Sequence, residues 1–229
     1  MDRVRKVLRY CRYGSRFIIL FFILYFPFVQ GKPLGEKKIP VYTEYKAATN
    51  HFIPSNYMDG ALVRGALVVN QNWQDNPYSG KSAIRLQYTH PENAGYYGGG
   101  MYWAYPANNW GKNPAGINLT GVRQLTFAMR SDTPGEMIYI LIGGIGYQQL
   151  DGVPFCDQPS QPYPDSVCPP IKLALTLEPD WKVYTIDLTG ENQRDFHKVI
   201  GGFGFWASKS VTVYLDDIIY HAPLDTNQN

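Results

Sequence analysis

Apolar and polar residues alternate in short segments along most of the chain. Ile84, Leu86 and Tyr88 share one face of an extended segment, and Arg85 and Gln87 share the other. Clusters of Gly, Pro, Asn and Asp separate such segments. The pattern predicts strands over 83–88, 125–131, 183–188, 202–206 and 211–215. A continuous apolar run, Met137–Ile142, is typical of a central strand covered on both faces.

No window of helical length keeps a 3.6-residue period. We therefore predict an all-β fold, a sandwich of two packed antiparallel sheets. The roughly 200 residues that follow the N-terminal segment are enough for one such domain with a substantial core. Trp181 opens one of the predicted strands, and we expect it in the core.

The N-terminal segment reads as a secretory signal. Its first sixteen residues carry six basic side chains and one acid, and an apolar run follows over 17–29. Thirteen residues of helix span about 20 Å, less than the hydrocarbon core of a bilayer. Cleavage near Gly31 is the favoured outcome, and an uncleaved membrane anchor is the alternative.

The leader changes the charge balance of the chain. It holds six of the 21 basic residues and one of the 19 acidic residues, so the remainder carries 15 basic and 18 acidic residues and a net charge of −3. A mildly acidic chain of this kind is an improbable partner for nucleic acid. We expect a monomer that meets a membrane only through an uncleaved leader.

Two of the three cysteines remain after the leader is removed. Cys156 and Cys168 form an even pair in an exported chain, which predicts one disulfide. Two free buried thiols are the alternative. The sequence therefore predicts a signal over 1–31, a linker over 32–45, the sandwich over 46–222 and a tail over 223–229, in a secreted or cell-surface protein.

Several runs, in this order, resemble the β-jelly-roll carbohydrate-binding modules of the galactose-binding-domain-like class. The match spans roughly residues 52–220. The runs are NPYSGKS at 76–82, YWAYPANNWG at 102–111, NLTGVRQLTFA at 118–128, WKVYTIDL at 181–188 and VYLDDI at 213–218. The resemblance implies a non-catalytic sandwich that binds polysaccharide or oligosaccharide, often with a structural calcium ion.

Aromatic residues make up 15% of the chain, and many stand beside Gly or Asn. A flat ring stacks on the apolar C–H face of a sugar, and neighbouring amides bond the hydroxyls. Large rings also fill the cores of sandwiches, so each ring has a second interpretation. The predicted ligand-binding residues are Trp103, Trp110, Tyr147, Trp206, Tyr97, Tyr105 and Asn109.

Calcium binds hard oxygen ligands, and in such sandwiches it usually ties an early loop to the last strand. Asp216 and Asp217 stand side by side on that strand, so one of them points inward. The predicted metal ligands are Asp216, Asp217, Asp75 and Asp59. In the alternative, one aspartate accepts hydrogen bonds from backbone amides and the other is solvated.

Two rival functions stay open. A glycoside hydrolase or polysaccharide lyase would need a pair of carboxyl groups at a suitable separation, and the candidates are Asp132, Glu136, Asp151 and Asp157. The four histidines show no metal-ligand spacing, and the chain has no nucleophile-elbow motif. The second rival is a structural surface protein that binds another protein.

Overall fold

A computed structural model describes residues 35–92, 95–150, 153–156, 161–191 and 194–224. The predicted leader, 1–31, lies outside these residues. Within the described ranges, no helix has both the length and the apolar character needed to cross a membrane.

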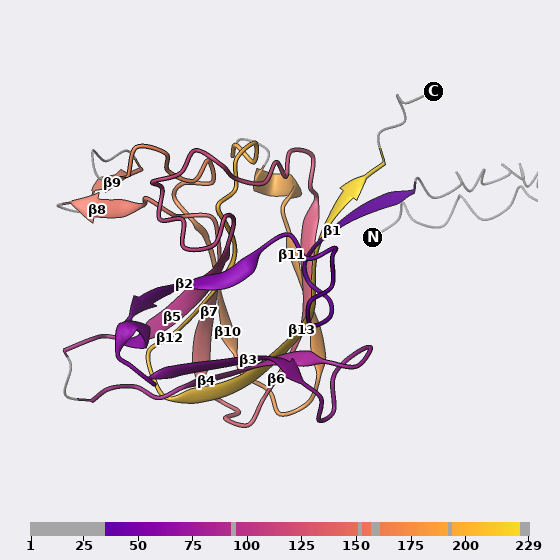
Figure 1. The fold of residues 1–229 in the computed structure, drawn as a ribbon, viewed down its shortest axis with the longest axis vertical. Coiled ribbons are helices and arrows are strands. Elements are labelled where there is room, and N and C mark those ends of the chain that lie inside the picture. The colour runs from indigo at the N-terminus through magenta and orange to yellow at the C-terminus, as the bar shows by residue number, and fades with distance from the viewer. Residues whose placement is uncertain (1–34, 93–94, 151–152, 157–160, 192–193, 225–229) are drawn as a thin grey trace, which may run out of the picture. The chain divides into compact units, whose positions relative to one another are not determined.

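Two antiparallel sheets form the protein (Figure 1). The six-stranded sheet has the order β11-β6-β13-β4-β3, and β1 pairs with β13 outside this path. Its strands are β1 (Glu36–Tyr42), β3 (Leu67–Trp73), β4 (Ala83–Tyr88), β6 (Gln124–Ser131), β11 (Lys182–Asp187) and β13 (Val211–Pro223). The five-stranded sheet has the order β10-β7-β12-β5-β2. Its strands are β2 (Ile53–Asp59), β5 (Gly99–Ala104), β7 (Met137–Ile142), β10 (Ile171–Thr176) and β12 (Gly201–Ala207).

The remaining elements are short. β8 (Gln148–Leu150) and β9 (Val153–Phe155) form a hairpin, and 3-10 turns occupy Gly60–Leu62 and Thr189–Glu191. The predicted two-sheet sandwich is confirmed, and each strand predicted from alternation is present. β13 runs eight residues beyond the predicted segment.

The core lies between the two sheets, and aromatic rings link them. Phe127 of β6 stacks on Tyr184 of β11 with ring centroids 5.3 Å apart. Phe203 of β12 meets Phe127 and Trp103 edge to face, each at 5.4 Å between centroids. These contacts add to the burial of large apolar surfaces, and they join both sheets in one core.

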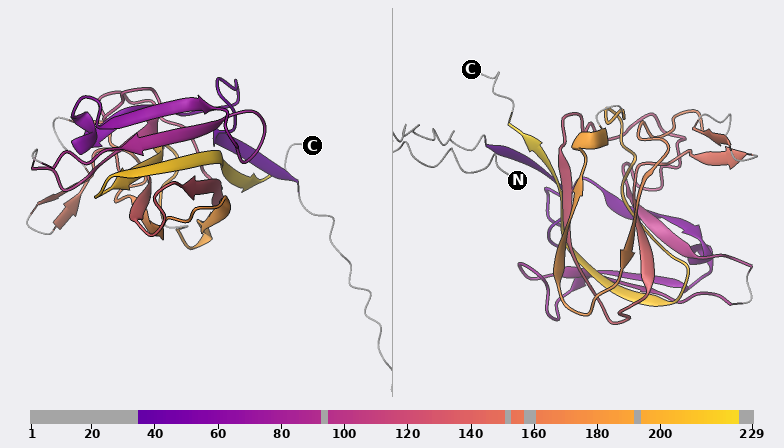
Figure 2. Two further views of the ribbon diagram at one scale, coloured as in Figure 1. Left: turned by 90° about the horizontal axis from the view of Figure 1, so that it is seen from below. Right: turned by 180° about the vertical axis from the view of Figure 1, so that it is seen from behind.

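The predicted linker, 32–45, is wrong over residues 36–42. Residues 36–42 form β1, which pairs along the end of β13 from Glu36↔Pro223 onward (Figure 2). Ile39, Val41 and Tyr42 on this strand are buried. The exposed Glu36, Lys37 and Lys38 at its start hid the strand in the sequence, because an edge strand tolerates charge.

Removing β1 tests its part in the fold. A chain that begins at Thr43 loses three buried apolar side chains, each contributing about 1.5–3 kcal/mol. We expect its free energy of unfolding to be at least about 3 kcal/mol below that of a chain that begins at Gly35, measured by urea unfolding. Equal stabilities of the two chains would contradict this placement of β1.

Candidate functional site

The outer face of the five-stranded sheet carries a row of side chains directly opposite one another. Phe205 and Ile140 point into the core, so their neighbours Trp206 and Tyr139 point outward. The register pairs Trp206 with Tyr139 across β12 and β7, and with Gly100 across β12 and β5. Side chains opposite each other in an antiparallel pair lie on the same face. We call Met58, Gly100, Trp206 and Tyr139 the Trp206 row.

Two rings form the centre of this row. The Trp206 and Tyr139 ring centroids are 5.7 Å apart with planes tilted by 50°. The Lys172 ammonium lies 3.8 Å from the Tyr139 centroid, and an Asp59 carboxylate oxygen lies 3.4 Å from the Trp206 indole nitrogen. Trp206, Tyr139 and Met58 are half-buried. The row therefore offers apolar ring surface between a cation and a carboxylate.

Glycines let the backbone pass close to the Trp206 ring. A Cβ atom at Gly98 would overlap that ring, and one at Gly100 would overlap the Phe205 carbonyl. Side chains at these two positions would displace Trp206 or the neighbouring strand. The glycines therefore keep the face open around the ring.

Loops cover the other part of the same face. Tyr102, Ala104, Ile145 and Ile200 form a second buried cluster there, and Trp110 packs against it. Of the other predicted ligand residues, Tyr147 is half-buried, whereas Tyr105 is 38% and Tyr97 is 91% exposed. Gly98, which touches Trp206, follows Tyr97 directly. The structure thus brings Trp206 and Trp110 to one face and leaves Tyr97 and Tyr105 on exposed loops.

The predicted role of Trp103 is wrong. Its ring is 0% exposed and packs on Phe203 in the core, where no external ligand reaches it. Tyr102 and Trp103 are adjacent on β5, so only one of them faces the core. The sequence did not reveal which one.

The predicted role of Asn109 is also wrong. Its amide nitrogen donates to the carbonyls of Asn113 and Ala115, and its amide oxygen accepts from the N–H groups of Gly111 and Asn113. The side chain is 4% exposed. All of its hydrogen-bonding capacity holds the loop together, so none is left for a ligand.

Tyr139 and Lys172 were missed in the sequence. We predicted that Met137–Ile142 is covered on both faces, but Tyr139 and Leu141 are half-buried on the outer face. Ile138, Ile140 and Ile142 recur at every second position, and this alternation would have placed Tyr139 on the opposite face. Lys172 carries no signal in the sequence, because only its pairing next to β7 places it at the ring.

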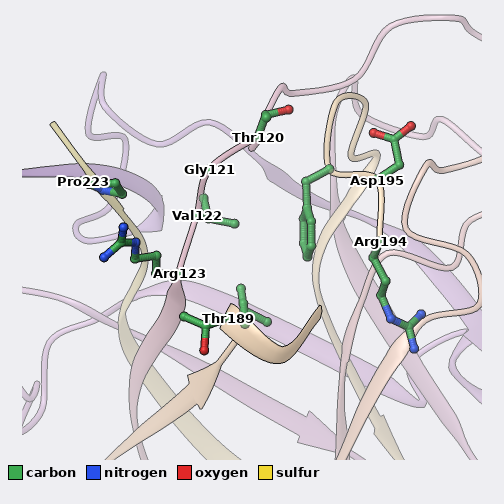
Figure 3. Close-up of a pocket in the computed structure, with 10 residues that line it drawn as sticks. Thr120, Gly121, Val122, Arg123, Thr189, Arg194, Asp195 and Pro223 are labelled. Carbon is green, nitrogen blue, oxygen red and sulfur yellow. The ribbon is translucent and has the colours of Figure 1, made fainter. Parts of the chain in front are cut away.

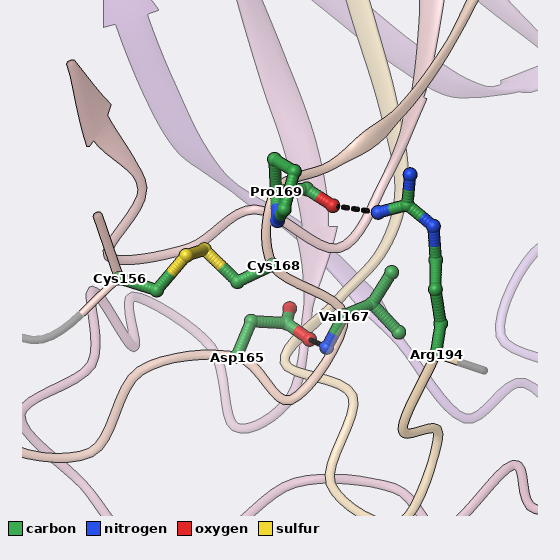
Figure 4. The surroundings of a disulfide bond; sticks show 6 residues. All are labelled: Cys156, Asp165, Val167, Cys168, Pro169 and Arg194. Atoms are coloured by element: carbon green, nitrogen blue, oxygen red, sulfur yellow. Dashed lines mark hydrogen bonds between the residues drawn. A yellow bond between two sulfur atoms is a disulfide. The ribbon is translucent and has the colours of Figure 1, made fainter. Parts of the chain in front are cut away.

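The disulfide is confirmed. Cys156 and Cys168 are bonded with their Cα atoms 6.0 Å apart, a normal separation (Figure 4). Beside it, Asp165 is 3% exposed, and its carboxylate accepts hydrogen bonds from the N–H groups of Val167, Ile200 and Gly201. The disulfide ties the 161–170 loop to the residue after β9, and Asp165 ties it to the start of β12, which carries Trp206.

The predicted calcium ligands do not meet. Asp59 lies beside Trp206 on the five-stranded sheet, whereas Asp216 lies in the other sheet. Asp75 is exposed and Asp217 is half-buried. No group of three or more His, Cys, Asp or Glu side chains in the described ranges could hold a metal ion. The four predicted aspartates therefore do not gather into one group of carboxylates, and calcium binding stays a prediction.

Asp216 instead binds backbone amides, as in the alternative interpretation. Its carboxylate accepts from the N–H groups of Tyr78 and Ser79 at 3.1 Å and of Asp217 at 2.8 Å. N–H donors that converge on a carboxylate occupy the positions a cation would take. Burial raises the pKa of Asp216 to about 6, although these bonds oppose the shift.

Glu44 holds the same loop and was missed because it falls in the predicted linker. Its carboxylate accepts from the Lys81 N–H and from the Ser82 hydroxyl, at 2.5 and 2.6 Å. These bonds lower the pKa of Glu44. Asp216 ties the 78–82 loop to β13, and Glu44 ties it to the segment after β1. We call this arrangement the carboxylate clamp.

Two grooves lie away from the Trp206 row. They have volumes of about 520 and 540 Å³ and share Arg123, Thr189 and Pro223. Figure 3 shows Thr120 to Arg123 on one side of the first groove, with Arg194 and Asp195 on the other. None of the predicted ligand-binding residues lines either groove.

Two solved structures that this chain resembles in fold are carbohydrate-binding modules. A crystal structure of a family 30 carbohydrate-binding module is 14% identical, with a TM-score of 0.50 over 84% of this chain and 91% of that chain. The family 30 module of a cellulosomal cellulase of Clostridium thermocellum is also 14% identical, with a TM-score of 0.50 over 83% and 99% of the two chains. The chain therefore has the β-jelly-roll fold. In sequence, no family model and no curated protein matches it.

The buried acids predict a stability that falls as the pH rises. Burial raises the pKa of Asp165 to about 7 and that of Asp216 to about 6, both above the ordinary value of 3.8. The folded chain therefore binds more protons than the unfolded chain between about pH 4 and 7, and it gains stability as the pH falls through this window. We expect urea unfolding to show greater stability at pH 5 than at pH 8.

Asp165→Asn provides the control for this dependence. The amide cannot titrate, so the difference between pH 5 and pH 8 should shrink. The pKa values of Glu44, Asp187 and Asp195 are lowered in the folded chain, so these groups change its stability only below about pH 4.5. They do not contribute to the difference between pH 5 and pH 8. Stability that rises from pH 5 to pH 8 would contradict the assignment.

For calcium to bind, backbone carbonyls would have to complete its ligands. An ion that binds only the folded chain raises its unfolding midpoint. Thermal unfolding in calcium and in EDTA measures this effect. Equal midpoints would count against the ion and leave the carboxylate clamp as the link between the loop and β13.

Proposed function

We propose that the protein binds carbohydrate on the outer face of its five-stranded sheet. The observation that carries the proposal is a pair of adjacent rings, Trp206 and Tyr139, that lie half-buried on the outer face of regular strands. The jelly-roll fold supports it, because the solved structures above are of carbohydrate-binding modules.

The chemistry of the row suits a sugar. The apolar C–H face of a pyranose stacks on the negative face of an aromatic ring, and Trp206 provides the larger ring. Lys172 donates hydrogen bonds to sugar oxygens, and the Asp59 carboxylate accepts them from hydroxyls. Trp110 and the loops behind it form a wall at one end of the face. A chain of sugar residues would lie across the strands, along the Trp206 row.

We further propose that the chain acts outside the cytoplasm. The Cys156–Cys168 disulfide supports this location, because such bonds persist in oxidising compartments. The basic and apolar leader, 1–31, would direct export, and its cleavage would release the domain.

The candidate catalytic acids give no support to an enzyme. Asp132 accepts hydrogen bonds from Arg130 and from the Tyr214 hydroxyl, and Glu136 pairs with Lys209 at 3.0 Å. Asp151 and Asp157 lie outside the described residues. We therefore propose binding without catalysis.

Trp206→Ala tests the binding face directly. Loss of the stacking ring should weaken binding to a recognised polysaccharide at least ten-fold, which corresponds to about 1.4 kcal/mol. A glycan array identifies the ligand, and titration calorimetry then compares the purified variants.

Tyr45→Ala is the matched control. Tyr45 is an exposed ring, 42% accessible, on the loop between β1 and β2, and its removal should leave affinity unchanged. The proposal fails if the native chain binds no polysaccharide, or if the two variants lose equal affinity.

A further inference from the structure

The outer face of the six-stranded sheet carries a second row of aromatic rings, and this row includes arginines. Leu86, Leu215 and Met129 are buried in the core, so the residues before or after them on each strand face outward. The register pairs Arg85 with Tyr214 across β4 and β13, and Tyr214 with Arg130 across β13 and β6. These side chains therefore lie on the same outer face, in one line across three strands.

Two tryptophans extend the line. The Arg85 guanidinium lies 5.1 Å from the Trp73 ring centroid, and Trp73 lies 5.8 Å from Tyr214. At the other end, Arg130 lies 3.7 Å from the Tyr214 ring and 5.6 Å from the Trp181 ring. We call these five side chains the arginine row. Trp181, which we predicted in the core, is thus half-buried on the surface.

The hydrogen-bond donors of this row outnumber their acceptors. Arg130 donates to Asp132, which also accepts from the Tyr214 hydroxyl at 2.7 Å. The Arg85 guanidinium contacts the Trp73 ring, but it forms no side-chain hydrogen bond or ion pair within the described ranges. The Nε atoms of both arginines and the Trp73 indole nitrogen are buried without an acceptor. A half-buried guanidinium without a hydrogen-bond acceptor destabilises the folded chain unless a ligand or water supplies acceptors.

We propose that the arginine row binds an acidic polysaccharide, through carboxylate or sulfate groups at Arg85 and sugar stacking on Trp73 and Trp181. Charge selects the ligand, because an anionic oxygen adds Coulombic attraction to the hydrogen bonds of the guanidinium, and a carboxylate can accept two of them at once. Rings and arginines also suit single-stranded nucleic acid. The disulfide favours a polysaccharide outside the cell, because such bonds persist in oxidising compartments.

This site is independent of the Trp206 row, since the two rows lie on the outer faces of opposite sheets. Either row can bind its ligand when the other row does not. Neutral and acidic ligands would then be held by different faces of the same domain.

Arg85→Gln tests the proposal. Binding of the purified chain to immobilised polygalacturonate and to dextran sulfate should fall at least ten-fold, while Arg64→Gln, the same charge change at an exposed loop residue, leaves it unchanged. Trp206→Ala should also leave it unchanged. Arg85→Lys keeps the charge without the planar fork, so it should bind with intermediate affinity. The unfolding midpoint of each variant confirms that it is folded.

Four outcomes would overturn the site. The chain could bind neither acidic polymer, or Arg85→Gln and Arg64→Gln could weaken binding equally, which indicates unspecific charge attraction. Trp206→Ala could abolish binding, which places the acidic polymer on the other face. Stronger binding to a single-stranded oligonucleotide than to either polymer would assign the row to nucleic acid.

Discussion

The six-stranded sheet depends on the backbone hydrogen bonds of β13, because this strand pairs with three others. Its first half pairs with β4 and its second half with β1, while β6 runs along its other side. The register shifts between Asp216 and Ile219, and Asp217 has a positive φ of 46°. This irregular point lets the strand change one neighbour for another. Asp216 stands there and binds the 78–82 loop, so a buried carboxylate stabilises an irregular point of the sheet.

Alternation predicted the sheets well because a half-buried strand must place apolar residues at every second position. It did not say which face of a strand meets the other sheet when both faces carry rings. Trp103 and Tyr102 illustrate this, since only the fold places Trp103 inside. In β7, the tyrosine at 139 was hidden within an apolar run. β1 was missed for the opposite reason, since charged residues at its start resembled a linker.

The candidate site was harder to predict than the fold, because side chains from distant strands compose it. Trp206, Tyr139 and Lys172 come from three strands that are neighbours only in the sheet. Asn109 stands beside an aromatic residue, as sugar-binding amides do, yet the turn it closes uses all of its bonds. Both outer rows place aromatic rings on neighbouring strands of one sheet face. They differ in their polar partners, which are Lys172 and Asp59 in one and two arginines in the other.

The ends of the described chain meet at one point. β1 runs antiparallel to the end of β13, and the Leu224 N–H donates to the Gly35 carbonyl at 2.9 Å. A domain whose ends adjoin can be inserted into a surface loop of another protein with little distortion of either partner. The sandwich is therefore suited to insertion into another protein through both of its ends, with the outer faces of its two sheets still accessible.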